Sequence, residues 1–188
     1  MGAVRSIVAV ITTGVLVFGS APAGATVFEK GHYSGTDSFS YDDCGFPVQV
    51  EVEFSGVFVI REGKHKKETA FFAHDNYSYR ETHTNLDTGE FFVIYGNGNF
   101  NETKATRVEG SVFEFTGVNA GQVFTVEDSA GNVVLRDRGS IRETILFDTG
   151  GDEVPGGTFI ESIDVQVNGP HPGFNVDFCE IAADLIGS

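Results

Sequence analysis

The chain of 188 residues carries 27 acidic and 12 basic residues, which gives a net charge of −15 at pH 7. A field of this sign repels phosphate backbones and anionic headgroups, so nucleic acids and membrane surfaces are not expected partners. The 24 glycines, 18 phenylalanines and absence of tryptophan are typical of a protein built from strands and turns. After residue 26 we find no long helical period and no internal repeat.

The N-terminal segment predicts a secretory signal over residues 1–25. Arg5 precedes an apolar run at 7–18, and Ala23-Gly24-Ala25 supplies the small residues that a signal peptidase requires. An uncleaved membrane anchor is the alternative, but the run is short and interrupted for a span. No later stretch is long and apolar enough to cross a bilayer. We therefore expect a secreted, extracellular protein whose mature chain begins at Thr26.

The segment after the signal is long enough to bury one core, so we expect one domain over 44–188, preceded by an N-terminal arm over 26–43. The central strand of that domain is expected directly after Cys44. There Val48, Val50, Val52 and Phe54 alternate with polar residues, which is the period of a strand with one apolar face. Ser55-Gly56 interrupts this pattern and predicts a bulge or bend.

About nine strands are expected, separated by turns rich in glycine, asparagine and aspartate. The turn Asp128-Ser-Ala-Gly-Asn132 is the strongest hairpin signal, and Gly63–Lys67 is expected to be a solvated basic hairpin tip. The expected strands cover 38–41, 48–60, 69–84, 91–95, 105–116, 122–127, 133–135, 141–147 and 159–167.

This regular spacing, with no crossover helix, favours an all-β fold consisting of one antiparallel up-and-down β-barrel of eight to nine strands. Closing the sheet removes the exposed edges that a long open sheet would present. A two-sheet β-sandwich is the alternative.

The two cysteines are Cys44 at the start of the central strand and Cys179 near the end of the chain. Two cysteines in a secreted chain most often pair, and neither has a neighbouring cysteine or histidine that would indicate a metal site. We therefore predict a structural disulfide rather than a reactive thiol.

Several of these turn and closure motifs also carry a family resemblance. The segments 85–89 and 128–137, the acidic loop after Phe147 and Asp177-Phe-Cys179-Glu180 resemble features of a family of uncharacterised secreted proteins from high-GC Gram-positive bacteria. The resemblance implies compartment and fold only, because that family has no assigned activity. By architecture alone, lipocalin-like barrels and the allene-oxide-cyclase and dirigent barrels are more distant analogues. The lipocalin Gly-x-Trp signature is missing from a chain without tryptophan.

Three carboxylates fall on the apolar parity of their strands and are the candidate catalytic residues: Asp75, Glu143 and Glu161. If the last two strands form a hairpin through the 149–157 loop, Glu143 and Glu161 lie about a diagonal pair apart. A low-dielectric interior raises a carboxyl pKa, which suits a general acid or base. The alternative is that either glutamate lies in water at the barrel mouth or pairs with an arginine, namely Arg107, Arg136 or Arg142.

Aromatic side chains on the inner parity are expected to line a small-molecule cup together with these acids. The candidate ligand-binding residues are Tyr77, Tyr79, Phe113, Phe115 and Phe124. The histidines have no metal-ligand spacing, and the acidic loop at 148–153 does not match an EF-hand, so no metal and no cofactor is expected.

Our leading interpretation is a secreted, disulfide-closed monomeric β-barrel that binds a small apolar molecule and is not an enzyme. An isomerase or cyclase that uses an interior carboxylate is the second interpretation. An envelope or interaction protein that acts through its outer surface is the third.

Overall fold

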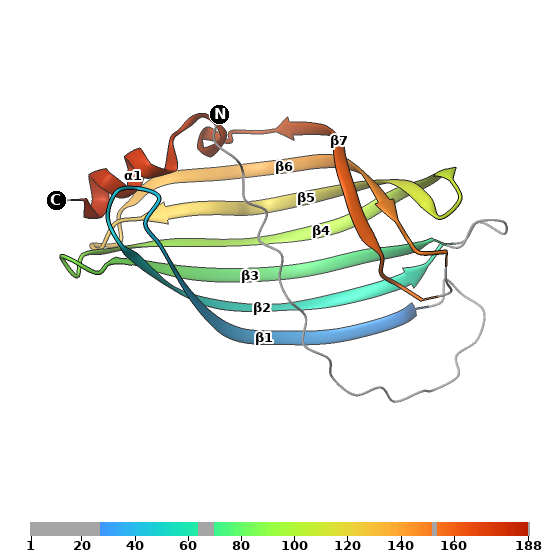
Figure 1. Cartoon of the computed structure of the whole chain (residues 1–188), viewed down its shortest axis with the longest axis horizontal. Helices are drawn as coiled ribbons and strands as arrows, with labels where there is room; N and C mark the ends of the chain where they lie inside the picture. The colour runs from blue at the N-terminus through green and yellow to red at the C-terminus, as the bar shows by residue number, and fades with distance from the viewer. Residues whose placement is uncertain (1–26, 64–69, 152–153, 188) are drawn as a thin grey trace.

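The computed structural model describes residues 27–63, 70–151 and 154–187, and these form a single sheet of seven antiparallel strands. Consecutive strands pair with one another from β1 to β7, so the topology is a simple up-and-down meander (Figure 1). The strands are β1 Val27–Tyr41, β2 Val48–Glu62, β3 Phe71–Asn85, β4 Phe91–Glu109, β5 Val112–Glu127, β6 Val133–Asp148 and β7 Thr158–Asn168.

The strands are longer and fewer than expected, because several glycine-rich segments continue a strand. β2 passes through Gly56 without a shift in its register to either neighbour, so the expected bulge there is wrong. The Gly96–Asn99 segment stays within β4 and only shifts the register to β5. Conversely, the strand expected over 105–116 is divided by the turn between β4 and β5. The hairpin turn at 128–132 is confirmed.

The N-terminal segment is a full strand rather than an arm. β1 pairs with β2 from Val27 to Tyr41, where we expected a short strand near its end only. Its sequence alternates glycine, serine and aromatic residues, so its own apolar pattern is weak. Pairing along all of β2 supplies the backbone hydrogen bonds that stabilise it. The expected signal at 1–25 and the lysines of the basic turn lie outside the described residues.

The described sheet is not closed, so the all-β, up-and-down architecture is confirmed while the barrel is not. A single sheet also differs from the two sheets of a sandwich. The sheet is strongly curled, and β7 crosses in front of the central strands (Figure 1). All residues of β7 are exposed, including Phe159, Ile163 and Val165, which are 56%, 51% and 49% exposed.

After β7 the chain forms a short 3-10 helix, η1 Pro172–Asn175, and then the nine-residue helix α1 Phe178–Ile186. We did not predict this helix. Asp177 is its N-cap and accepts a hydrogen bond from the Cys179 amide, which satisfies one of the first free N–H groups. Ala182 and Ile186, four residues apart, are its buried positions.

α1 packs on one side of the sheet, which we call the helix face. There Val48, Val50, Phe92, Ile94 and Val126 are buried with Ala182 and Ile186, and we call this set the helix cluster. The expected inward parity of Val48 and Val50 is therefore confirmed. A second buried set, the far cluster, contains Ala70, Phe113 and Phe115. Strand register places it toward the other end of the same face.

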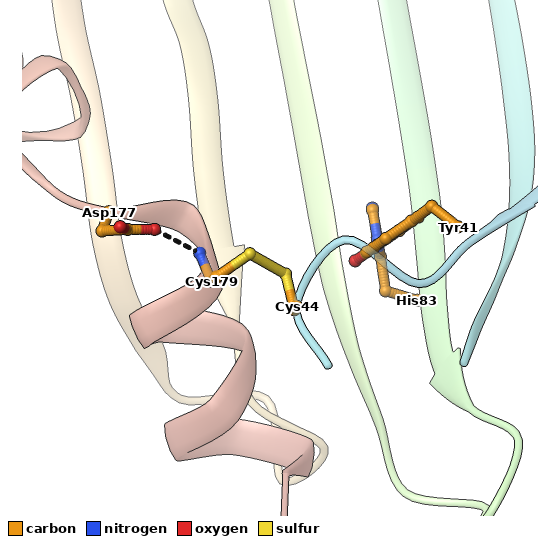
Figure 2. Close-up of a disulfide and its surroundings, with 5 residues drawn as sticks. All are labelled: Tyr41, Cys44, His83, Asp177 and Cys179. Carbon is orange, nitrogen blue, oxygen red and sulfur yellow. Dashed lines mark hydrogen bonds between the residues drawn. A yellow bond between two sulfur atoms is a disulfide. The ribbon is translucent and has the colours of Figure 1, made fainter. Parts of the chain in front are cut away.

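The predicted disulfide is present between Cys44 and Cys179, whose Cα atoms are 5.0 Å apart. It joins the β1–β2 connection to the first turn of α1 (Figure 2). Because these residues are 135 positions apart in sequence, the bond restricts most of the unfolded chain. Asn85 adds a second tie, since its side-chain amide donates to the Ile186 carbonyl at 2.6 Å.

A buried polar cluster lies beside the disulfide. His83 contacts Glu81 at 3.0 Å through Nε2 and the Tyr41 hydroxyl at 3.3 Å through Nδ1. Figure 2 shows Tyr41 and His83 side by side near Cys44. The imidazole also stacks on Phe92, with ring centroids 4.8 Å apart, and meets Phe178 of α1. This packing assigns the cluster a structural role beneath the helix.

Candidate ligand-binding site

The helix face has a middle band between its two clusters. Strand register brings Phe58 of β2, Asp75 of β3, Phe100 of β4 and Asn119 of β5 into one row across the sheet. The neighbouring row contains Tyr33 of β1 and Tyr77 of β3, separated by Gly56. We call these six side chains the middle band, and each of them is partly exposed.

Glycines on neighbouring strands allow the aromatic rings of this region to lie flat on the sheet. The Tyr33 ring occupies the place that a side chain at Gly56 would fill. In the same way, a Cβ added at Gly98 would lie 2.7 Å from the Tyr77 hydroxyl, and one at Gly117 would lie 2.7 Å from the Phe100 ring. A side chain at these positions would lift the ring. These glycines thus leave room for the rings of the middle band on the sheet. We call the rings of Tyr33, Phe58, Tyr77 and Phe100 the aromatic floor.

Hydrogen bonds fix the tyrosines of this floor in place. The Tyr33 hydroxyl donates to Asp75 Oδ2 at 2.7 Å, and the Tyr77 hydroxyl donates to Asn119 Oδ1 at 3.0 Å. Tyr79 borders the band and donates to the Val123 carbonyl at 3.0 Å. Each phenol therefore reaches across an intervening strand. This pre-arranges the rings, so a ligand would not have to order them.

Asp75 is the acidic group of the middle band, and one of its oxygens is unsatisfied. Oδ2 accepts the hydrogen bond from Tyr33, while Oδ1 is buried and makes no hydrogen bond among the described residues. In the next row toward the far cluster, Glu102 accepts a hydrogen bond from the Ala73 amide at 2.6 Å, and burial raises its pKa. An unsatisfied buried acceptor costs free energy and often marks a functional site.

The surroundings raise the pKa of all five tyrosines. Burial raises the pKa of Tyr41 to about 12, with Glu81 adding to the shift. Burial also raises the pKa of Tyr33, with the hydrogen bond to Asp75 second, and burial is the main cause at Tyr77 and Tyr79. At Tyr95, on the opposite face, the hydrogen bond to Glu127 is the main cause.

Tyrosine ionisation is therefore expected to accompany unfolding. The unfolded chain ionises its phenols near pH 10, whereas the folded protein keeps them protonated to higher pH, so the tyrosine contribution to stability is fully present below about pH 10 and is lost as pH rises above it. Phenolate absorbance should rise together with loss of the β-sheet circular dichroism signal. Reversible titration of Tyr33, Tyr77 or Tyr79 near pH 10 in the folded protein would contradict the hydrogen-bonded floor.

The structure divides the predicted ligand-binding residues among three places. Tyr77 lies in the middle band and Tyr79 at its border, as the shared parity with Asp75 predicts. Phe113 and Phe115 are core residues of the far cluster, and Phe124 packs against the helix cluster. Tyr33, Phe58, Phe100 and Asn119 were missed. Tyr33 was assigned to an arm, and the other contacts depend on long-range register that periodicity does not specify.

Glu143 and Glu161 are not brought together, so the expected diagonal pair is wrong. Glu143 lies opposite Val165 on the helix face and accepts a hydrogen bond from Ser162 at 2.8 Å. The β6–β7 register shifts between Thr144 and Ile145, which places Glu161 opposite Leu146 on the other face. Both glutamates are exposed, so neither has the low-dielectric surroundings that we expected.

A second buried histidine–carboxylate contact was also missed. His171, in the loop after β7, lies with Nδ1 3.8 Å from Asp137 Oδ2, and the Gly173 amide donates to Asp137 Oδ1 at 2.9 Å. These contacts attach the loop to β6. Among the described residues, no group of three or more histidines, cysteines, aspartates or glutamates is arranged to hold a metal ion.

The face opposite α1 has two shallow hollows of about 470 and 490 Å³. Both include Ser55 and Ser78, which register aligns with Ser34 and Asn97 in one row of small polar side chains. Six of the nine residues around each hollow alternate onto this face. The hollows are open, and they lack the enclosure of a typical small-molecule site.

Comparisons with known proteins do not assign the chain to a family. No family model, no curated protein and no solved structure matches it. No helix among the described residues combines the length and apolar character needed to cross a membrane. The functional proposal therefore depends on the geometry of the helix face.

Proposed function

We propose that this protein is a secreted binding protein that holds a small, largely apolar molecule against the aromatic floor of the helix face. The observation that carries the proposal is the row of rings seated over glycines, with every tyrosine hydroxyl already paired. Side chains that are fixed, flat and partly exposed offer contact area at little cost in entropy. Because the tyrosine hydroxyls already have hydrogen-bond partners, the ligand does not have to provide them.

We propose binding rather than catalysis because the candidate acids do not form an acid–base pair. Glu143 and Glu161 are exposed and lie on different faces, and the buried His83–Glu81 contact is packed beneath α1. Of the three candidate acids, only Asp75 lies in the middle band. A general acid or base needs a reacting proton within hydrogen-bond reach, and one carboxylate tied to a tyrosine favours binding over turnover.

Secretion and barrel closure belong to the same proposal. The disulfide and the acidic composition suit an extracellular protein. β1 and β7 are the free edges of the sheet, and both expose large apolar side chains, among them Phe39 at 47% and Val165 at 49%. Pairing of these edges would cover the apolar side chains and enclose a ligand on the helix face.

Binding of the neutral apolar dye Nile red, followed by its fluorescence, tests this function. We expect Tyr77→Ala to weaken binding about tenfold or more, because loss of one aromatic contact costs at least about 1.4 kcal/mol. Tyr95→Ala is the matched control, since it removes the same ring from the opposite face and should leave the affinity within about twofold.

Circular dichroism melting of both variants establishes that they are folded under the binding conditions. Gly98→Leu gives a second test without deleting the ring, because the new side chain would displace Tyr77 from its seat. Equal losses in Tyr77→Ala and Tyr95→Ala, or no dye binding by the native protein, would contradict the proposed function.

A further inference from the structure

The distribution of charge over the two faces points to the kind of ligand. Arginines and lysines of the described strands fall almost entirely on the face opposite α1, by strand parity and register. That set is Lys30, Arg61, Arg80, Lys104, Arg136, Arg138 and Arg142. Arg107 alone falls on the helix face, where it lies 4.8 Å from the Phe113 ring in the far cluster and donates to the Gly110 carbonyl.

The middle band thus contains a carboxylate with no basic side chain in its rows. Phe58 and Phe100 flank Asp75 across the sheet, and the other members of the middle band are Tyr33, Tyr77 and Asn119. The one hydrogen bond to Oδ2 leaves Oδ1 unsatisfied. A negative charge in such surroundings is poorly compensated, and the chain as a whole carries −15.

The aromatic rings around Asp75, like the carboxylate itself, favour a positively charged ligand. The face of an aromatic ring is electron-rich and attracts a cation placed above it. Donation of the Tyr33 hydroxyl to a carboxylate increases the electron density of that ring further. A positive group seated over Tyr33 would then interact with the ring directly and with Asp75 through a short, low-dielectric path. The buried position of Oδ1 is compatible with this arrangement, because the cation does not need to touch that oxygen.

We propose that the ligand of the aromatic floor is an organic cation, namely an amine or quaternary ammonium group attached to an apolar body, with Asp75 as its counter-ion. This inference rests on the proposed binding function and adds the chemical class of the ligand. The apolar body would lie over Phe58, Tyr77 and Phe100, and the positive group would lie toward Tyr33. Anionic ligands would be repelled by the same field.

Isothermal titration calorimetry with benzyltrimethylammonium, its neutral carbon isostere neopentylbenzene and the anion benzenesulfonate tests the charge preference. We expect the native protein to bind the cation at least tenfold more tightly than the isostere and to bind benzenesulfonate least. Equal affinities for the cation and its isostere would overturn the inference.

Asp75→Asn tests whether the preference comes from this carboxylate, because the change keeps the shape and removes the charge. It should weaken binding of the cation ten- to hundredfold and change binding of the isostere by less than threefold. Glu143→Gln is the matched control, since it removes one charge from the same face at a different place and should change cation binding by less than threefold. Equal losses in the two variants would indicate a general effect of net charge and would overturn the role of Asp75.

The outcomes separate this inference from the proposed function. Binding of the isostere that depends on Tyr77 but shows no preference for the cation would leave the binding function in place and remove the cation. No binding of either compound, together with no binding of Nile red, would remove both.

Discussion

Replacing both cysteines by serine, C44S/C179S, is expected to lower the free energy of unfolding by about 5 kcal/mol. The chain-entropy relation gives this value for a closed loop of 135 residues. Small domains have total stabilities of about 5–15 kcal/mol, so the loss would be a large part of the whole. Urea denaturation followed by circular dichroism measures it.

The location of the disulfide explains why its removal should affect more than the entropy of the unfolded chain. Cys179 lies in the first turn of α1, and this helix of nine residues is too short to persist without its contacts to the sheet. Reduction of the native protein by dithiothreitol should reproduce the shift, while the same reagent should not affect C44S/C179S. A loss below about 1 kcal/mol would show that α1 and the β1–β2 connection hold together without the bond.

Phe92→Ala should cost about 3–5 kcal/mol of stability, the usual range for a buried phenylalanine. Its ring is fully buried, stacks on His83 and lies 6.1 Å from the Phe178 ring of α1, measured between centroids. Its removal would leave a cavity at the centre of the helix cluster. Urea denaturation again provides the measurement.

The adjacent residue provides the control for this prediction. Phe91 points to the opposite face and is 40% exposed, so Phe91→Ala should cost less than about 1 kcal/mol. The pair tests the assignment of faces with the same substitution at consecutive positions. Similar losses at both positions would contradict the alternation on which the helix face is defined.

The parts of the fold that the sequence predicts are those that depend on local pattern. Alternation at Val48 and Val50 identifies a buried face because the strand period is two. The turn at Asp128–Asn132 follows from residues that hydrogen-bond locally, and the disulfide follows from the count of two cysteines in a chain that is expected to be secreted. None of these requires knowledge of which strands pair.

The parts that the sequence does not predict depend on the neighbours of each residue in space. Gly56 reads as a break in its strand, and Gly96 and Gly98 fall between the expected strands 91–95 and 105–116, but in the sheet all three lie beneath rings from adjacent strands. Tyr33 and Asp75 are 42 residues apart, and their contact requires the registers of both β1–β2 and β2–β3. One register shift in β6–β7 is enough to separate Glu143 from Glu161.

α1 escaped prediction for a different reason. Its nine residues provide little more than two turns, which is too short for a helical period to be recognised, and its apolar residues also suit a strand. The helix forms because the Asp177 cap, the disulfide and the apolar surface at Val48, Val50 and Phe92 stabilise it together. Tertiary context thus outweighs local propensity here.

The claim that the aromatic floor binds the ligand is tested most directly by ¹⁹F NMR of the protein labelled with 3-fluorotyrosine. The five tyrosines give five signals, assigned by single Tyr→Phe variants, and four of these residues lie on the helix face while Tyr95 lies on the other. On titration with benzyltrimethylammonium, the signals of Tyr33 and Tyr77 should shift while that of Tyr95 remains unchanged. A shift at Tyr95 with no change at Tyr33 and Tyr77 would contradict the account.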